Sequence, residues 1–108
     1  MDFKGINLRS SDLEGADLRG VNLSKVDLSK VDLNSALFTG ANLSGADLSS
    51  TNCKWIAFDG TNLTNVDFSK ADLSNTDFSK TDITKIKNYE ITKVYYNGKL
   101  VSIKDIKD

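Results

Sequence analysis

Residues 61–85 read TNLTN VDFSK ADLSN TDFSK TDITK, and this stretch decides the fold because it repeats itself every five residues. In each unit a small or β-branched residue is followed by Asp or Asn and then by Leu, Phe or Ile. Counting in fives from Phe3 to Ile83 gives seventeen central positions, of which sixteen hold Leu, Phe or Ile and one holds Cys53. A chance sequence does not keep such a register, so residues 1–85 are a repeat array.

A period of five fits neither an amphipathic helix, with 3.6 residues per turn, nor a plain strand, with a period of two. It fits a short extended segment followed by a turn. In an extended segment the central residue and the residue two before it point to the same side. The residues two before the centre are mostly Ala, Val or Ile, so one side is apolar. The residue between them and the two that follow are mostly polar, and we expect these to face water.

A weaker period of twenty residues predicts how the segments stack. Phe38, Phe58 and Phe78 lie twenty apart, and so do Gly20, Gly40 and Gly60. Four repeats per turn would give a square coil whose successive turns pair like a parallel sheet. The centres then stack on four faces: face one holds Phe3, Leu23, Leu43, Leu63 and Ile83; face two holds Leu8, Leu28, Leu48 and Phe68; face three holds Leu13, Leu33, Cys53 and Leu73; face four holds Leu18, Phe38, Phe58 and Phe78. The outward column Asn22, Asn42 and Asn62 could form a ladder of side-chain amides.

The pattern A-(D/N)-L-x-x, present here as GADLRG, GANLSG, GADLSS and KADLSN, resembles that of the pentapeptide-repeat family. The resemblance covers about 85 of the 108 residues. It implies an all-β fold, namely a right-handed quadrilateral parallel β-helix of about four coils. The core ladder of such a solenoid would include Leu23, Leu43, Leu63, Phe38, Phe58 and Phe78. The resemblance thus implies a repeat protein with a packed interior.

Residues 86–108, IKNYEITKVYYNGKLVSIKDIKD, have a different character and are predicted as a second unit after the repeat domain 1–85. Asn97-Gly98 is a strong signal for a β-hairpin, with strands near 89–96 and 99–104. Residues 1–85 contain nine basic and twelve acidic residues, whereas 86–108 contain five and three. An open last coil would be an exposed sheet edge. The hairpin is therefore either a cap on this edge or an interaction surface that includes Tyr95 and Tyr96.

A second break in the pattern lies within residues 37–60. On face four the outward positions read Asp17, Leu37, Ala57 and Asp77, so that two apolar residues replace the usual acid in adjacent coils. Trp55, the single tryptophan, is expected at a nearby corner and should also point outward. Tryptophan is enriched at the energetic centres of interfaces, so Leu37, Trp55 and Ala57 are candidate partner-binding residues. The alternative is that Trp55 folds over the coil as a local cover.

Nothing in the sequence indicates catalysis. There is no histidine, and the one cysteine, Cys53, falls at a core position, where a small buried hydrophobe is expected. The carboxylates follow a regular outward lattice, and a packed coil leaves no room for a substrate. No phosphate-binding glycine loop or Cys/His cluster is present. We therefore expect no enzyme, no catalytic residue, no cofactor, no metal site and no small-molecule substrate.

Composition narrows the function only to broad classes. The formal net charge is −1 and the hydrophobic content is 39%, which points to neither direct nucleic-acid binding nor a membrane. No apolar segment is long enough to span a bilayer, and we expect a cytoplasmic protein. The prediction is a non-enzymatic structural or protein-interaction solenoid whose partner is another protein or a second copy of itself. The alternative, taken from the resemblance, is an acidic DNA mimic that binds DNA gyrase, which inhibition of supercoiling would reveal.

Overall fold

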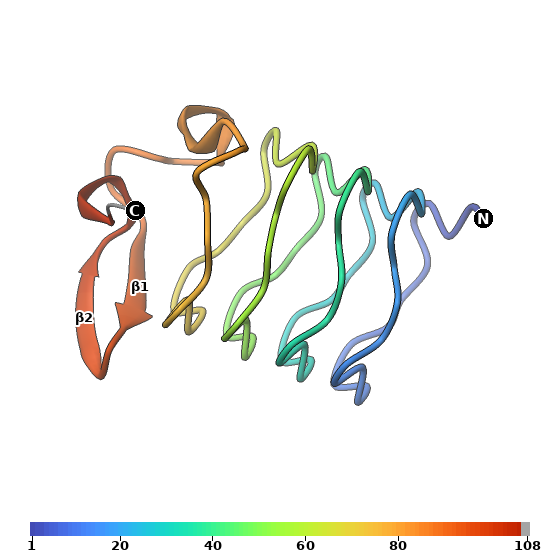
Figure 1. Cartoon of the computed structure of the whole chain (residues 1–108), viewed down its shortest axis with the longest axis horizontal. Helices are drawn as coiled ribbons and strands as arrows, with labels where there is room; N and C mark the ends of the chain where they lie inside the picture. Colours follow the sequence, from blue (N-terminus) through green and yellow to red (C-terminus); the bar gives the residue numbers. More distant parts are fainter. Residues whose placement is uncertain (107–108) are drawn as a thin grey trace.

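The computed structural model describes residues 1–106, and its dominant feature is a ladder of parallel β-bridges between residues twenty apart. Each bridge joins the outward residue before one repeat centre to its equivalent one turn later, as in Asp12↔Asp32, Asp32↔Asn52 and Asn52↔Asp72. Four repeats therefore make one turn of the coil. Figure 1 shows successive turns lying side by side from the N-terminus to the C-terminal hairpin.

A turn follows the extended segments because the fifth residue of each repeat from Gly5 to Asn75 adopts a left-handed backbone. These residues have φ between 57° and 73°, and they include six glycines of the repeat region. Glycine adopts positive φ without steric cost, and Asn does so more easily than other residues. Gly20, Gly40 and Gly60, which lie twenty residues apart in the sequence, occupy such corners. Lys25, Lys30, Lys70 and Trp55 also occupy such corners, although their side chains disfavour this conformation.

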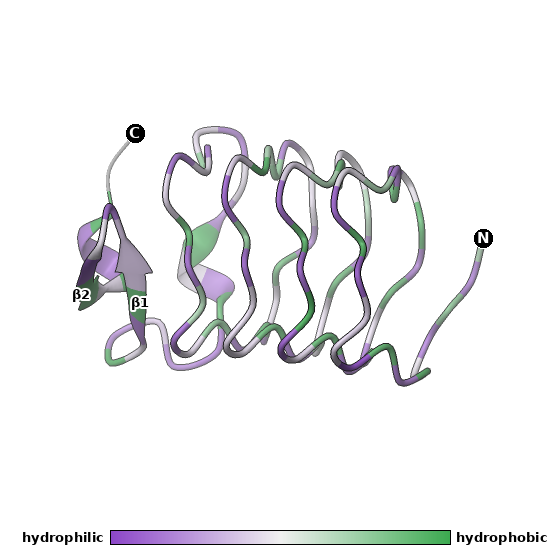
Figure 2. Ribbon diagram, turned by 90° about the horizontal axis from the view of Figure 1, so that it is seen from below, coloured by the Kyte–Doolittle hydropathy of each residue, from purple (hydrophilic) through white to green (hydrophobic). Residues whose placement is uncertain are grey.

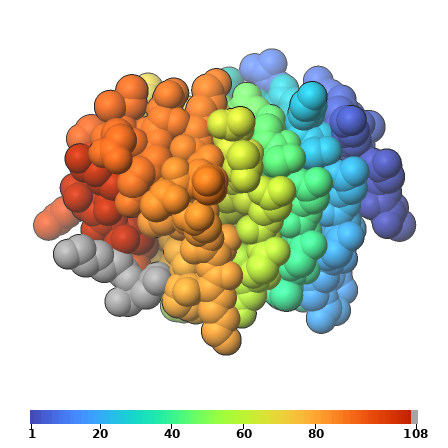
Figure 3. All heavy atoms as spheres, turned by 90° about the horizontal axis from the view of Figure 1, so that it is seen from above, coloured from blue at the N-terminus to red at the C-terminus, as the bar shows by residue number. Residues whose placement is uncertain are grey.

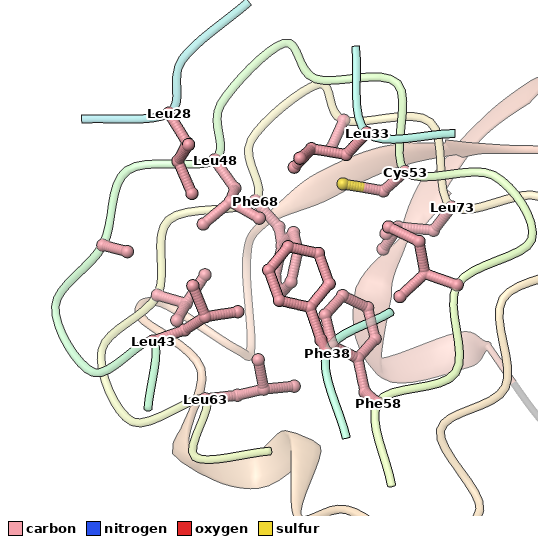
Figure 4. Close-up of a cluster of buried hydrophobic side chains, with 14 of the residues drawn as sticks. Leu28, Leu33, Phe38, Leu43, Leu48, Cys53, Phe58, Leu63, Phe68 and Leu73 are labelled. Atoms are coloured by element: carbon pink, nitrogen blue, oxygen red, sulfur yellow. The ribbon is translucent and has the colours of Figure 1, made fainter. Parts of the chain in front are cut away.

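The core lies inside the coil and consists of the repeat centres with the small residues two positions before them. Figure 2 shows hydrophobic and hydrophilic residues alternating along the ribbon of the coils. Leu28, Leu48 and Phe68 point inward from one side, and Leu33, Cys53 and Leu73 from another (Figure 4). On face four the rings of Phe38 and Phe58 stack with centroids 5.7 Å apart, and Phe58 stacks on Phe78 at 5.4 Å. Offset aromatic pairs contribute about 0.5–1.5 kcal/mol beyond burial of their area.

The outward Asp and Asn residues serve the backbone rather than one another. The Oδ1 of Asn22 accepts a hydrogen bond from the Ser24 N–H at 3.0 Å and one from the Ser24 hydroxyl at 2.8 Å. Asn42 and Asn62 likewise accept from the N–H two residues later, so their oxygens stabilise local turns. This is a different role from the predicted amide ladder. The same bonds fold some serines inward, and the expectation that the residue after the centre faces water is wrong for Ser24, Ser29 and Ser74.

The regular coil changes after Asp77, the last residue of the twenty-residue bridges. Asp82 caps a short 3₁₀ helix, η1 (Ile83–Lys85), because its Oδ1 accepts from the Thr84 N–H at 3.0 Å. Ile83 lies in this helix and not in an extended segment of the coil. It is half-buried and packs against the edge of the core. Two antiparallel strands follow, β1 (Lys93–Tyr96) and β2 (Lys99–Ser102), and then a second 3₁₀ helix, η2 (Ile103–Asp105).

The predicted hairpin is present, but its strands are shorter than expected. Residues 89–92 form a turn in which Thr92 N–H donates to Asn88 O, and η2 replaces the predicted end of the second strand. Asn97 and Gly98 have φ of 53° and 79°, as a two-residue hairpin turn requires. The register places Tyr96 opposite Lys99 and Tyr95 opposite Leu100.

Strand β1 adds to face three of the last coil. Asp72 forms a parallel bridge with Tyr95; Leu73 N–H donates to Tyr95 O at 2.8 Å, and Tyr95 N–H donates to Ala71 O at 2.7 Å. Val94 is fully buried against this coil. The hairpin therefore extends the stack at its C-terminal end, where it forms the last bands of the surface (Figure 3). No helix in residues 1–106 is both long and apolar enough to cross a membrane.

Candidate interaction site

Leu37 and Ala57 occupy adjacent rungs of one outward column. Parallel bridges join Asp17 to Leu37, Leu37 to Ala57, and Ala57 to Asp77. Both apolar residues are exposed, Leu37 with 41% of its surface accessible. The corner that follows this column is made by Gly20, Gly40 and Gly60, which have no side chains to rise above it. The result is a flat apolar strip on face four with an acid at either end.

Trp55 lies at the corner between face three and face four, two residues before Ala57. It is 62% exposed, and its N–H donates to Ser74 O of the next coil. Its φ is 62°, in the left-handed region. A bulky residue in this region is an outlier that costs about 1–2 kcal/mol. The equivalent corners one turn before and after hold Ser35 and Asn75, which tolerate the conformation better. We call Leu37, Trp55 and Ala57 together the platform.

The two hairpin tyrosines point to opposite sides. Tyr95 is 41% exposed and continues the outward column of face three, whereas Tyr96 is partly buried and packs against the core. Leu100, which is 52% exposed, lies directly opposite Tyr95 and therefore shares its side of the hairpin. Sequence reasoning missed Leu100. The pairing register of a two-residue Asn97-Gly98 turn would have revealed it, because this turn places residues 95 and 100 opposite each other.

The six residues of the predicted core ladder have no accessible binding surface. Leu23, Leu43, Phe38 and Phe58 are fully buried, and Leu63 and Phe78 are 2% and 4% exposed. Figure 4 shows four of them, Phe38, Leu43, Phe58 and Leu63, pointing into the inside of the coil. They position the outward columns, and the platform residues project from the same segments.

Cys53 is buried in the core, and its environment disfavours the thiolate. Burial raises the pKa of its thiol to about 12, with a smaller opposing effect from a hydrogen bond to Thr51. The Thr51 Oγ1 lies 3.0 Å from the Cys53 Sγ. Since the thiolate is the reactive form, this thiol is unsuited to nucleophilic chemistry at neutral pH.

Several outward aspartates have a lowered pKa because they accept hydrogen bonds from the residue two positions later. The side-chain and backbone bonds from Ser29 lower the pKa of Asp27, and those from Ser79 do the same for Asp77. For Asp17 the bonds from the Arg19 guanidinium lower the pKa to about 2. The Arg19 Nη2 lies 2.7 Å from the Asp17 Oδ2. These carboxylates are therefore charged acceptors at neutral pH, with no proton to transfer there.

One group of carboxylates gathers on face three near the N-terminal end. Carboxylate oxygens of Asp12, Glu14 and Asp32 all lie within 4.8 Å of one another. Asp12 and Glu14 are exposed and Asp32 is half-buried. The arrangement is a patch of negative charge at the surface. Within residues 1–106, no buried side-chain nitrogen or oxygen lacks a hydrogen-bond partner.

Comparison with known families gives a match over residues 19–87 to the model described as "Pentapeptide repeat region". The chain belongs to the pentapeptide-repeat family. This confirms the resemblance seen in the repeat motifs and agrees with an all-β architecture. No curated protein matches the chain.

Solved structures of other pentapeptide-repeat proteins are similar to the chain. Rfr23 from the cyanobacterium Cyanothece 51142 is 31% identical over 70% of this chain and 53% of its own, with a TM-score of 0.41. HetL from Nostoc sp. strain PCC 7120, a protein involved in heterocyst differentiation regulation, is 29% identical over 69% of this chain and 48% of its own, with a TM-score of 0.45. QnrB1, a plasmid-mediated fluoroquinolone resistance protein, is 17% identical over 89% of this chain and 58% of its own, with a TM-score of 0.45. This pentapeptide-repeat chain spans about half the length of these relatives.

Proposed function

We propose that this pentapeptide-repeat chain is a non-enzymatic interaction module, built as a right-handed quadrilateral β-helix, that binds another protein through the platform. The observation that carries the proposal is the backbone of Trp55, whose φ is 62° while its side chain is 62% exposed. The coil imposes this conformation at its corners, so the strain lies in the presence of a bulky side chain at this one. Strained residues cluster at functional sites. An exposed indole gives little compensation within the free protein.

The surroundings of Trp55 support a protein partner. Leu37 and Ala57 break the acidic column of face four in the two coils nearest to this corner. Tryptophan with adjacent apolar surface, ringed by polar groups, is typical of the centre of a protein–protein interface. The flat glycine corner beside the strip allows close approach of an extended surface. We place the chain in the cytoplasm, because its one cysteine is a free thiol, which is usual in a reducing compartment.

The chemistry of the titratable side chains supports a role without catalysis. The aspartates whose pKa values are shifted have lower values, and the Cys53 thiol has a higher one, so none of these groups is poised to exchange a proton near neutral pH. A general acid or base would need a pKa close to the working pH. The platform combines an exposed aromatic side chain with exposed apolar side chains on the surface of the coil.

Site-specific photo-cross-linking in the source cells tests the proposal. The photoreactive residue p-benzoylphenylalanine replaces Trp55 in one variant and Asn65 in a control variant. Asn65 is exposed and lies at another corner with φ of 58°, so the two probes share backbone geometry and solvent access. We expect one discrete adduct from position 55 and none from position 65. Equal labelling of many proteins from both positions, or no adduct from position 55, would contradict the platform as a binding site.

A further inference from the structure

Face three ends in an open strand edge at the N-terminal end of the coil. Leu13 N–H donates to Asp32 O at 2.9 Å, and Ser11 O accepts from Asp32 N–H at 3.3 Å. Between these two residues, the N–H and C=O of Asp12 point away from the second coil. Neither group has a backbone partner within residues 1–106. Asp12 therefore presents a donor and an acceptor that a further strand could pair with.

The same face ends in an open edge at the C-terminal end. Tyr95 uses its N–H and C=O on Ala71 and Leu73, so it cannot share them with Leu100, the residue opposite it on β2. Antiparallel pairs alternate between hydrogen-bonded and non-hydrogen-bonded, and Tyr95–Leu100 is therefore of the second kind. It follows that the N–H and C=O of Leu100 point away from β1. They too have no backbone partner in the described part of the chain.

The two edges match in the directions of their side chains. Asp12, Asp32, Asn52, Asp72 and Tyr95 form one bridged column whose side chains point outward. Leu100 lies on the same side as Tyr95, because residues directly opposite each other share a side of the sheet. A strand pair with Leu100 opposite Asp12 would keep the outward residues outward. It would also place Val101 opposite Ser11 and Lys99 opposite Leu13 on the inner side, where Leu13 is only partly covered.

The charges at the two ends of face three are opposite. The N-terminal end carries the carboxylates of Asp12, Glu14 and Asp32 within 4.8 Å of one another. At the other end Lys93 lies on the outward side, where its Nζ is 3.1 Å from the Ser102 Oγ. Pairing two β2 edges would bring like charges together, as would pairing two first coils. Pairing one end with the other brings opposite charges together.

We propose that copies of this chain associate head to tail. Strand β2 of one copy pairs antiparallel with residues 11–13 of the next, with Leu100 opposite Asp12, so that face three continues across the junction. The contact joins two different surfaces, so each dimer keeps one free edge of each kind and can add further copies. The inference is independent of the platform, which lies on face four and its corner.

Two proline variants test the proposal by removing one unused donor each. Leu100→Pro removes the outward N–H of β2, which the hairpin does not use, and proline is tolerated at such edge positions. Asp12→Pro removes the matching N–H of the first coil. Its lost side-chain bond to Glu14 N–H is dispensable, because Leu37 and Ala57 occupy the same repeat position without an Asp or Asn side chain.

Light scattering over a hundredfold range of concentration gives the readout. We expect the wild-type mass to rise with concentration beyond two protomers of 11.8 kDa. Each proline variant alone should remain a monomer. An equal mixture of the two should form a dimer and stop there, because Asp12→Pro keeps an intact β2 and Leu100→Pro keeps an intact first coil. Trp55→Asn should associate like the wild type.

Other outcomes overturn the proposal. A wild-type mass of one protomer throughout would do so, and so would association of Asp12→Pro alone, which would indicate pairing between two β2 edges. A mixture that stays monomeric would also exclude the head-to-tail contact. Circular dichroism and thermal melting check that the variants fold. If Leu100→Pro melts early, Leu100→Asp replaces it, since a carboxylate there would face the acidic end of the next copy and should abolish association.

Discussion

At the scale of single residues, the corner of a repeat requires a left-handed backbone, which some side chains adopt more easily than others. Asn65 and Asn75 suit their left-handed corners, with φ of 58° and 60°, whereas Trp55 does not. Asn enters this region at lower cost because its short polar side chain bonds locally. The left-handed corner is common to the repeats from Gly5 to Asn75, so the strain at residue 55 comes from its bulky side chain.

Replacing Trp55 by Asn should stabilise the free protein. Relief of the left-handed strain should raise the free energy of unfolding by about 1 kcal/mol, less the small contribution of indole contacts, since most of the side chain is exposed. Thermal melting measures the effect, and a gain of this size raises Tm by about 4–8 °C in a small domain. The reciprocal variant Asn65→Trp should lower Tm. A lower Tm for Trp55→Asn would instead show that the indole is a structural cover.

The hydrogen-bonded aspartates predict a loss of stability in acid. The bonds from Ser29 lower the folded-state pKa of Asp27 below its ordinary value of 3.8. A group with a lowered pKa contributes stability above its unfolded pKa, and this contribution is lost as pH falls through the folded pKa. The wild type should therefore lose Tm as pH falls below about 4. Asn stands at the same repeat position in Asn22 and Asn42, where its Oδ1 accepts the same backbone bond.

Asp27→Asn should keep that backbone bond without a titrating group. We expect its Tm at pH 7 to fall by no more than a few degrees, and its further loss between pH 7 and pH 3 to be smaller than that of the wild type. Melting curves at both pH values give the comparison. An equal loss in both proteins would show that Asp27 contributes nothing to the acid sensitivity.

At the scale of elements, the hairpin and the coil depend on each other. Strand β1 has the coil on one side and β2 on the other, and Val94 is buried between hairpin and core. A two-stranded hairpin alone is marginally stable in water. The last coil gains a partner for its edge, and the hairpin gains a third strand and an apolar surface.

Gly98→Val should release the hairpin from the coil. Gly98 has φ of 79°, where a β-branched residue is strained by about 1–2 kcal/mol. Hydrogen exchange would then accelerate at Lys70 N–H and Leu73 N–H, which donate to Lys93 O and Tyr95 O of β1. Cys53 N–H donates to Asp72 O within the coil and serves as the control, with its protection expected to persist. Unchanged protection of Leu73 would mean that the hairpin holds without its turn.

At the scale of the whole molecule, the distribution of charge bears on the alternative function. The Asp27, Asp47 and Asp67 column is bridged along face two, as an acidic surface that imitates DNA would require. Yet the repeat region carries nine basic residues against twelve acidic ones, and the whole chain has a net charge of −1. The Cα extents are 33 × 23 × 19 Å, so the molecule is only modestly elongated. Shape and charge therefore differ from those of the long, strongly negative rod that a DNA mimic requires.

The sequence by itself determined the repeat, the inward residues and the coil of four repeats, because each unit of five encodes the same extended segment and turn. It also predicted the Asn97-Gly98 turn and the apolar break at Leu37 and Ala57. Each of these features is set by residues adjacent in the sequence or by the regular spacing of five residues. For the same reason the sequence indicated that Cys53 belongs to the core.

Only the tertiary structure decided where the hairpin docks, since Tyr95 pairs with Asp72 across 23 residues, outside the period of twenty. It also decided that Ser24 is buried and that Ile83 lies in a 3₁₀ helix. The backbone N–H and C=O of Leu100 face outward because β1 pairs with the coil on one side and with β2 on the other. No local sequence pattern indicates this arrangement. Contacts outside the repeat depend on how the ends of the stack pack, and a periodic sequence carries no information about its own ends.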